Sequence, residues 1–259
     1  MNGAIDWPAQ VVGERLAALL PGARLEIAPT IDSTNSELMR RARAGHCDAV
    51  LLVAEQQTAG RGRLGRSWQS AVGDSLTCSL GLPLAPQDWS GLSLAAGVAV
   101  AEALHAAVEL KWPNDLWIGG RKLGGILVET ATASGGGALR RHAVIGVGIN
   151  IAARSAQGLS TAAAALRELW PDADAGAVLA RVGPALLQAL LEFERAGFDA
   201  FAARFATRDL LRGRPVVLSD GTVGTACGVT GQGALLVHTA AGMISVTSSE
   251  VSVRPAPAA

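Results

Sequence analysis

Arginine alternates with glycine in the segment from Gly60 to Arg66, which reads Gly-Arg-Gly-Arg-Leu-Gly-Arg. Glycines let backbone N–H groups come close to an anion, and a guanidinium group binds phosphate or carboxylate through two parallel hydrogen bonds. Like charges at this spacing repel one another unless an anion lies between them. A solvated basic turn would not need a glycine at every other position. The segment therefore predicts a loop that binds an anion.

The same segment contains a formal Gly-x-Gly-x-x-Gly pattern, formed by Gly60, Gly62 and Gly65, but the dinucleotide-binding interpretation fails. That interpretation needs a helix directly after the loop and an acidic residue about 20 positions later. Residues 68–74 do not predict a helix, and residue 80 is a leucine. A Walker A loop is excluded as well, because Gly-Lys-Ser/Thr does not occur in the chain.

Lysine is rare in this chain: of the 22 basic residues, only Lys111 and Lys122 are lysines. A compact ammonium group acts as a point charge, whereas a planar guanidinium group presents a rigid fork of donors, so the two do not replace each other. A site that needs the ammonium therefore keeps its lysine even where arginine is preferred elsewhere. We expect these two lysines to act in function, and the alternative is coincidence with ordinary surface ion pairs.

Each lysine belongs to a short motif. Lys111 opens Lys-Trp-Pro-Asn-Asp, which joins a rigid Trp-Pro turn to the amide of Asn114 and the carboxylate of Asp115. The carboxylate can hold Mg²⁺ or orient a basic partner, although Asn-Asp is also ordinary turn chemistry. Lys122 stands at the start of an expected strand, in which Gly124-Gly125 permits a ligand to approach closely.

The composition narrows the class of protein. The 259 residues are 49% hydrophobic and their net charge is zero, which excludes a disordered chain and argues against a general basic surface for DNA. The uncharged stretch Trp89–Ala101 is too short to span a membrane, and residues 1–10 lack a signal-peptide pattern. The three scattered cysteines predict reduced thiols in a cytoplasm, and Cys and His show no metal-binding spacing.

Hydrophobic periodicity places these motifs on an α+β framework. The expected helices are Val11–Leu20, one that opens with a capping box formed by Thr34 and Glu37, Ser90–Ala107, Ala175–Glu194 and Phe198–Thr207. The expected strands are Ala49–Ala54, Ser75–Leu80, Leu116–Ile118, Leu123–Glu129 and Ala143–Ile151, with a surface loop at 133–138. Val-rich runs between glycines follow Arg212 and predict a small all-β module, so we place a domain boundary near residue 210.

Three blocks in this order resemble the biotin–protein ligases. They are Gly-Arg-Gly-Arg-x-Gly-Arg at 60–66, Lys-Trp-Pro-Asn-Asp at 111–115 and Arg-Lys-Leu-x-Gly-Ile-Leu-Val-Glu at 121–129. Ser33-Thr34-Asn35, Gln56-Gln57 and Gly146–Asn150 also look like segments of that family. The similarity is close from Ile31 to Ile151 and looser elsewhere. It implies a catalytic domain of the class II aminoacyl-tRNA-synthetase-like type at 1–210 and a small SH3-like barrel at 211–259.

The resemblance also implies a reaction in two steps. The carboxylate of biotin attacks the α-phosphate of MgATP to give biotinyl-5′-AMP and pyrophosphate, and a lysine of a biotin carboxyl carrier protein or domain then displaces AMP. Neither step needs a nucleophile on the enzyme, whereas cations must offset the repulsion between carboxylate and triphosphate. The implied substrates are biotin and ATP with Mg²⁺, the implied partner is the carrier, and a homodimer stays open.

The resemblance assigns a role to each motif residue. The expected catalytic cations are Lys122, Arg61 and Arg63, which bind the biotin carboxylate and the α-phosphate. The expected biotin-binding residues are Ser33, Thr34, Asn35 and Gln56 at the ureido ring, together with Gly60, Arg61, Gly62, Arg63, Lys122, Gly124 and Gly125. The expected residues for ATP or the adenylate are Arg63, Arg66, Trp68, Lys111, Asn114, Asp115 and Asn150, and Asp115 is the candidate Mg²⁺ ligand.

The chain departs from the family pattern in three places. Leu64 stands where a further arginine is common, and Ser160–Ala163 replaces a Thr-Ser-Leu-like run. The 31 residues before Asp32 are too few for the winged helix-turn-helix that many members carry, so we expect no DNA binding. One rival is a lipoate ligase or octanoyltransferase, which lacks the lysine and arginine blocks. The rival from another class is a non-catalytic nucleotide- or RNA-binding module, against which the neutral net charge argues.

Overall fold

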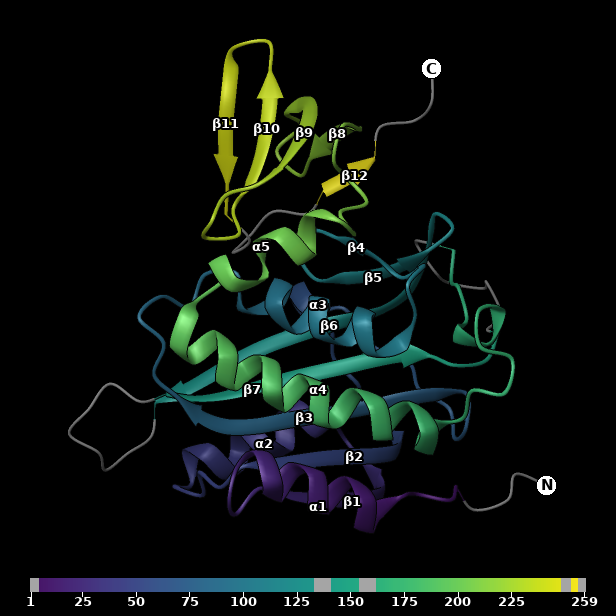
Figure 1. Ribbon diagram of the computed structural model, residues 1–259. Coiled ribbons are helices and arrows are strands. Elements are labelled where there is room, and N and C mark those ends of the chain that lie inside the picture. Colours follow the sequence, from purple (N-terminus) through teal and green to yellow (C-terminus); the bar gives the residue numbers. More distant parts are fainter. Residues whose placement is uncertain (1–4, 133–140, 154–161, 248–252, 256–259) are drawn as a thin grey trace.

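A computed structural model describes residues 5–132, 141–153, 162–247 and 253–255; the expected loop at 133–138 and the first residues of the run 160–163 lie outside the described residues. A seven-stranded sheet forms the centre, in the order β1-β2-β3-β7-β6-β5-β4 (Figure 1). Its strands are β1 (Arg24–Ile31), β2 (Val50–Gln57), β3 (Ser75–Leu84), β4 (Glu109–Lys111), β5 (Asp115–Ile118), β6 (Arg121–Thr132) and β7 (Arg141–Asn150). β1 and β2 are parallel, and the other neighbouring pairs are antiparallel.

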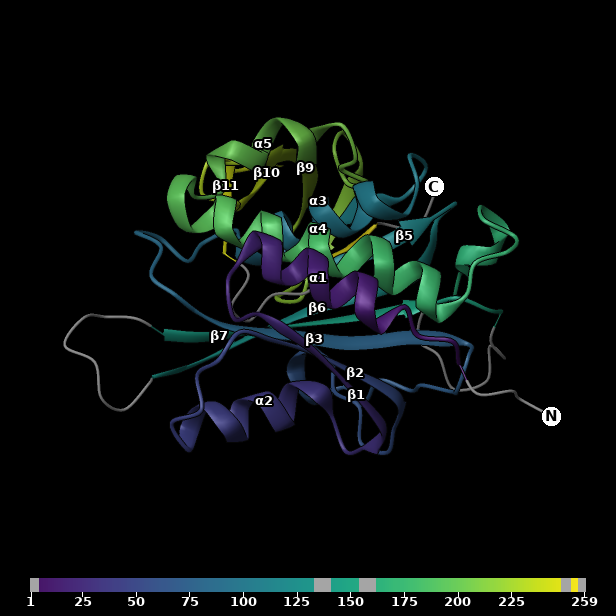
Figure 2. The same ribbon diagram turned by 60° about the horizontal axis from the view of Figure 1, so that its bottom comes forward.

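Helices cover both faces of this sheet (Figure 2). On one face lie α1 (Ala9–Leu19), α3 (Leu92–Leu104) and α4 (Ala175–Ala196), while α2 (Thr34–Arg43) lies on the other. Strand β2 shows why both faces are filled. Leu51 and Val53 belong to the large core on the α4 side, whereas Val50 and Leu52 belong to a smaller cluster with Leu38 of α2. Alternate residues of a strand point to opposite faces, so a strand buried on both sides is continuously apolar.

Helix α4 is the longest of the described helices, and it is largely apolar. By length and composition it could cross a membrane, a property that the sequence analysis did not assign to it. Its buried side chains instead belong to the core, and it packs against α1, α3 and β3. We therefore interpret α4 as a core helix.

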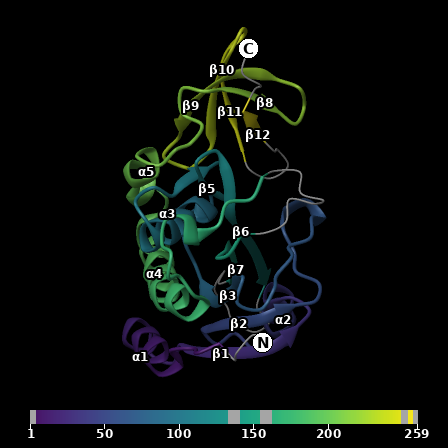
Figure 3. The same cartoon turned by 90° about the vertical axis from the view of Figure 1, so that its right-hand side faces the viewer.

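A second sheet lies at one end of the molecule, after α5 (Asp199–Ala206) (Figure 3). It is five-stranded and antiparallel, in the order β11-β10-β9-β8-β12. Its strands are β8 (Pro215–Leu218), β9 (Val223–Val229), β10 (Leu235–Thr239), β11 (Gly242–Val246) and β12 (Val253–Pro255). The fully buried Trp112 joins the two sheets, because its indole N–H donates to the carbonyl of Gly233 at 3.0 Å. This sheet matches the expected all-β module.

Most expected helices and strands are confirmed with small shifts at their ends, but the sequence analysis missed β1 and β4. The capping box at Thr34 was wrong. Ser33 is the N-cap of α2 and accepts a hydrogen bond from the Ser36 N–H at 3.4 Å. Glu37 pairs with Arg40 and Arg41 rather than with the helix N-terminus, because two guanidinium groups lie within reach one turn later.

Candidate functional site

Strand β7 has glycine at alternate positions on the face that α2 covers. A Cβ atom at Gly146 would lie 2.2 Å from Oδ1 of Asn35, and one at Gly148 would lie 2.5 Å from the indole ring of Trp68. Real Cβ atoms do not come so close to other atoms. The Gly-x-Gly spacing therefore admits one side chain from α2 and one from the arginine loop onto the same strand.

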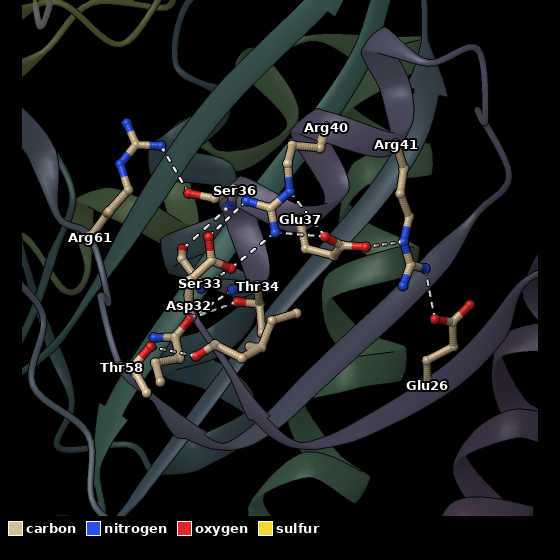
Figure 4. Close-up of polar contacts among 12 residues, drawn as sticks. Glu26, Asp32, Ser33, Thr34, Ser36, Glu37, Arg40, Arg41, Thr58 and Arg61 are labelled. Carbon is tan, nitrogen blue, oxygen red and sulfur yellow. Dashed lines mark hydrogen bonds and ion pairs between the residues drawn. The ribbon is translucent and has the colours of Figure 1, made fainter.

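The N-terminus of α2 contributes a buried polar cluster. Ser33, Thr34 and Asn35 are 2 to 3% exposed. The hydroxyls of Thr34 and Ser79 are 2.6 Å apart, and Ser79 in turn donates to Oδ1 of Asn35 at 2.6 Å. The backbone N–H of Thr34 donates to Oε1 of Gln57 at 2.8 Å. Figure 4 shows Ser33 and Thr34 beside the ion pairs of α2.

The structure brings Gln57, not the expected Gln56, to this cluster. Gln56 is exposed, whereas Gln57 contacts Thr34. Adjacent residues of a strand point to opposite faces, so an assignment that is off by one residue selects the wrong side chain. Ser79 was also missed, although the alternation of polar Ser75, Thr77 and Ser79 along β3 was visible in the sequence.

The arginine loop connects β2 to β3 and is closed by backbone hydrogen bonds. The Gly62 N–H donates to the Arg66 carbonyl at 2.7 Å, and the Trp68 N–H donates to the Gly60 carbonyl at 2.8 Å. A Cβ at Gly60 would lie 2.3 Å from the oxygen of Trp68, so this position requires glycine. The glycines therefore build a tight loop.

The tip of the loop is the short 3₁₀ turn η1 (Arg63–Gly65). Leu64 has a φ of 55° and is 59% exposed. A leucine in the left-handed region is strained, since its Cβ crowds the backbone there. Leu64 therefore points outward at the tip of the loop.

The loop arginines have different partners. Arg61 pairs with Glu129 of β6, with Nη2 3.1 Å from Oε1, and also lies 3.4 Å from Oγ of Ser36 (Figure 4). Arg63 donates to Oδ1 of Asn114 at 3.2 Å. Arg66 is exposed. Arg61 thus lies on the α2 side of the loop, and Arg63 lies on the side of the Lys-Trp-Pro-Asn-Asp motif.

The electrostatic setting of Arg63 is that of a half-buried cation. Burial lowers the pKa of its guanidinium, Asp115 opposes this effect and Arg66 adds to it. A partly desolvated guanidinium interacts more strongly with a bound anion than one in open water. Arg63 is therefore better placed than Arg66 to hold a negative charge.

Lys122 and Asp115 form the closest ion pair of the site. Nζ of Lys122 lies 2.6 Å from Oδ1 of Asp115. A Cβ at Gly125 would lie 3.4 Å from that oxygen and 3.6 Å from that nitrogen, so this glycine leaves the pair open. The other glycine of the pair, Gly124, lies against the β7 backbone, where a Cβ would come within 2.3 Å of the Gly148 oxygen.

Three further motif residues lie next to this ion pair in the sheet: Asn114 in the turn before β5, Lys111 on β4 opposite Asp115, and Asn150 on β7 beside the Lys122 backbone. The amide of Asn114 donates to the Ile126 carbonyl at 2.7 Å. Asn150 donates to the Ala164 carbonyl at 3.3 Å, and its buried Oδ1 accepts no hydrogen bond from the described residues. Such an acceptor suits an N–H donor of a ligand. Nζ of Lys111 lies 5.4 Å from the ring centroid of Trp117, over the indole face.

The site can accept Mg²⁺ only together with a ligand that supplies more oxygens. Among the described residues, no three His, Cys, Asp or Glu side chains converge on one point. Asp115 offers a carboxylate and Asn114 an amide oxygen, and both now face a cation. This donor set fits an ion that keeps phosphate and water ligands, as Mg²⁺ does with nucleotides.

Comparison with known proteins gives a consistent family. Residues 28–150 match the biotin/lipoate A/B protein ligase family, and residues 213–254 match the biotin protein ligase C terminal domain. The chain is 36% identical to the bifunctional ligase/repressor BirA of Salmonella typhimurium, covering 98% of this chain and 82% of the relative. It is 32% identical to the biotin--[acetyl-CoA-carboxylase] ligase of Mycobacterium tuberculosis, covering 88% of each.

A solved structure agrees with these relatives. The biotin protein ligase from Aquifex aeolicus, in complex with biotin and ATP, superimposes with a TM-score of 0.76 at 30% identity and covers 90% of this chain and 99% of that one. The fold expectation of a mixed α and β catalytic part with a small C-terminal antiparallel sheet is confirmed. The chain therefore belongs to the biotin protein ligase family.

Proposed function

We propose that this protein activates biotin with ATP and transfers it to a lysine of a biotin carboxyl carrier protein or domain. Membership of the biotin protein ligase family supports this class of reaction. The observation that ties it to this chain is the convergence of Arg63 and Lys122 on the adjacent residues Asn114 and Asp115, at 3.2 and 2.6 Å. Two cations beside one carboxylate leave a site that attracts anions.

In the first step, an oxygen of the biotin carboxylate attacks the α-phosphorus of ATP. A new P–O bond forms, the bond to the β-phosphate breaks and pyrophosphate leaves. Both reactants are anions, so cations must draw them together and stabilise the charge that develops in the transition state. Lys122 and Arg63 supply these cations, with Arg61 and Arg66 further along the loop.

In the second step, the carrier amine attacks the carbonyl carbon of biotinyl-5′-AMP. The C–O bond of the mixed anhydride breaks, AMP leaves and the nitrogen loses a proton. The same cations hold the phosphate of the adenylate, which keeps this reactive compound bound until the carrier arrives.

The buried cluster at the N-terminus of α2 is the proposed ureido site, with Thr34 and Gln57 as its polar contacts. Trp68, packed on Gly148, is a proposed contact of the nucleotide. So is Asn150, whose Oδ1 accepts no hydrogen bond from the residues that the structure describes. Asp115 and the oxygen of Asn114 would hold Mg²⁺ that arrives with ATP, where the ion would neutralise phosphate charge. Gly60 and Gly62, which carry no side chain, let the loop backbone come close to the carboxylate.

The proposal also includes the domain organisation, the cellular compartment and the assembly of the enzyme. The catalytic domain ends near residue 210, and the five-stranded sheet is the SH3-like module. The enzyme works in a cytoplasm, where ATP and its carrier are available, and a homodimer is its proposed assembly. A repressor role, which is part of the name of the Salmonella typhimurium relative, is not proposed for this chain.

Pyrophosphate release with ATP and either biotin or lipoate tests the reaction class. We expect release with biotin and none with lipoate, followed by AMP formation and a stable amide when a biotin carboxyl carrier domain is added. Release with lipoate in place of biotin would favour the lipoate ligase. No release with either acid, despite ATP binding, would favour a non-catalytic nucleotide-binding module.

A further inference from the structure

Glu129 is a carboxylate inside the polar cluster to which neither the motif analysis nor the proposed mechanism gives a role. It lies on β6, with its side chain 22% exposed. Oε2 accepts a hydrogen bond from Nδ2 of Asn35 at 3.0 Å, and Oε1 pairs with Arg61 at 3.1 Å. The Arg61 pair offsets the cost of holding this charge partly out of water.

The partners of Asn35 fix the direction of its amide. A carboxylate can only accept, so the atom of Asn35 that faces Glu129 must be the NH₂ group. The second hydrogen of that group faces the carbonyl of Leu127 at 3.3 Å. Oδ1 therefore faces Ser79, and Ser79 must use its single hydroxyl proton to donate to it, at 2.6 Å.

The same count of hydrogen-bond donors and acceptors applies to the hydroxyl of Thr34. Since the proton of Ser79 is engaged, the 2.6 Å contact between the two hydroxyls requires Thr34 to be the donor. Oε1 of Gln57 is 3.2 Å from the Thr34 hydroxyl and already accepts the Thr34 backbone N–H at 2.8 Å. The hydroxyl proton of Thr34 thus points to Ser79, and the oxygen keeps its lone pairs to accept a hydrogen bond from a ligand.

We propose that Glu129 is a positioning residue that sets Thr34 as a hydrogen-bond acceptor for a ureido N–H. The hydrogen bonds run in one direction, from Thr34 to Ser79 to Asn35 to the carboxylate. Two groups that can only accept hold the amide in this direction, and the Glu129 carboxylate at 3.0 Å is nearer and more strongly charged than the Leu127 carbonyl at 3.3 Å. An amide at the same position offers NH₂ to Asn35 and lets the chain reverse, so that Thr34 turns its proton toward the ligand. The inference rests on the proposed function, because it takes biotin as the ligand.

A double-mutant cycle on biotin affinity tests this role. Isothermal calorimetry would measure the Kd for biotin of the wild type, Glu129→Gln, Thr34→Val and the double variant. We expect each single change to weaken binding about tenfold, as loss of one hydrogen bond to the ligand does. The double variant should bind no more than about twofold more weakly than Thr34→Val, because both changes remove the same interaction.

Glu102→Gln is the matched control. Glu102 also pairs with an arginine, Arg204, and its side chain is 35% exposed, but it lies on α3 away from the site. It should leave the biotin Kd unchanged, while thermal unfolding checks that each variant folds.

The outcomes separate this inference from the proposed function. If the wild type binds no biotin, the proposed function fails. If the wild type binds biotin, two results overturn the role of Glu129: an unchanged Kd in Glu129→Gln, or losses that add in the double variant. Additive losses would mean that Glu129 acts independently of Thr34.

Discussion

Nζ of Lys122 lies 2.6 Å from Oδ1 of Asp115, and the two residues belong to adjacent strands of one hairpin. This ion pair connects two motifs that are separate in the sequence, the Lys-Trp-Pro-Asn-Asp block and the Arg-Lys-Leu block. Asp115 holds the ammonium in place while Gly125 leaves it uncovered. This arrangement orients a point charge toward a ligand without a side chain in its path.

Lys122→Arg should nearly abolish the first step although the charge is kept. The guanidinium is larger and planar, and it would form a two-point contact with Asp115 instead of presenting one ammonium to the phosphate. We expect pyrophosphate release to fall by about 10²-fold or more, in line with the loss of an electrostatic contact in a transition state. Stopped-flow measurement with saturating biotin and ATP would show this. A near-normal rate of pyrophosphate release in the variant would contradict the role of Lys122. It would also mean that the rarity of lysine in this chain is a coincidence.

Arg63→Gly should loosen the hold on the adenylate. Arg63 is half-buried, and its guanidinium lies 3.2 Å from Oδ1 of Asn114. Without it, biotinyl-5′-AMP should leave before the carrier arrives and acylate lysines on unrelated proteins. A streptavidin blot of mixed proteins would reveal the loss of selectivity, with Arg195→Gly, on the last turn of α4, as the control. Labelling confined to the carrier would contradict the role of Arg63.

The three motif blocks could be recognised in the sequence because each is local. Lys122, Arg63 and Asp115 stand in short motifs whose composition already indicates anion binding. The cluster around Thr34 was harder, since its members come from α2, β2, β3 and β6 and only the folded sheet brings them together. Local reasoning therefore selected Gln56, whereas Gln57 is the residue that contacts Thr34, and it overlooked Ser79.

Strand β1 shows the same limit for the fold. Its residues are half-buried or exposed, and Pro29 interrupts its apolar pattern. At the edge of a sheet, pairing depends on one neighbour only, so a strand can form there without strong apolar alternation. The strands with clear sequence signals, β3 and β7, are the central ones that are buried on both faces.

Gly148→Ala should impair nucleotide binding more than folding. Its Cβ would lie 2.5 Å from the Trp68 ring, so the indole must move, and the loop can allow this. We expect the KM for ATP to rise about tenfold, the scale of a lost aromatic contact, with a smaller change in the biotin Kd. Gly13→Ala in α1, where no atom lies within 4 Å of the new Cβ, is the control and should stabilise the protein by about 0.5–1 kcal/mol. An unchanged KM for ATP in Gly148→Ala would contradict the proposed contact between Trp68 and the nucleotide.

The buried His142 should make stability depend on pH below neutrality. It is 2% exposed, and burial lowers its pKa below the usual 6.5, with Asp48 opposing weakly. The unfolded chain therefore binds a proton near pH 6.5 while the folded chain does not. The contribution to stability is complete above that pH and is lost as pH falls toward the folded pKa, with a slope of at most about 1.4 kcal/mol per pH unit.

Urea unfolding between pH 5 and 7.5 would measure this slope for the wild type and for His142→Gln. The variant cannot take up a proton at this position, so its free energy of unfolding should change less steeply with pH below about 6.5. Leu187→Ala removes a buried side chain of α4 from the core on the other face of the sheet, and it should lower stability equally at every pH. If His142→Gln retained the wild-type slope while Leu187→Ala lowered the free energy of unfolding by the same amount at every pH, another group would be the one that titrates.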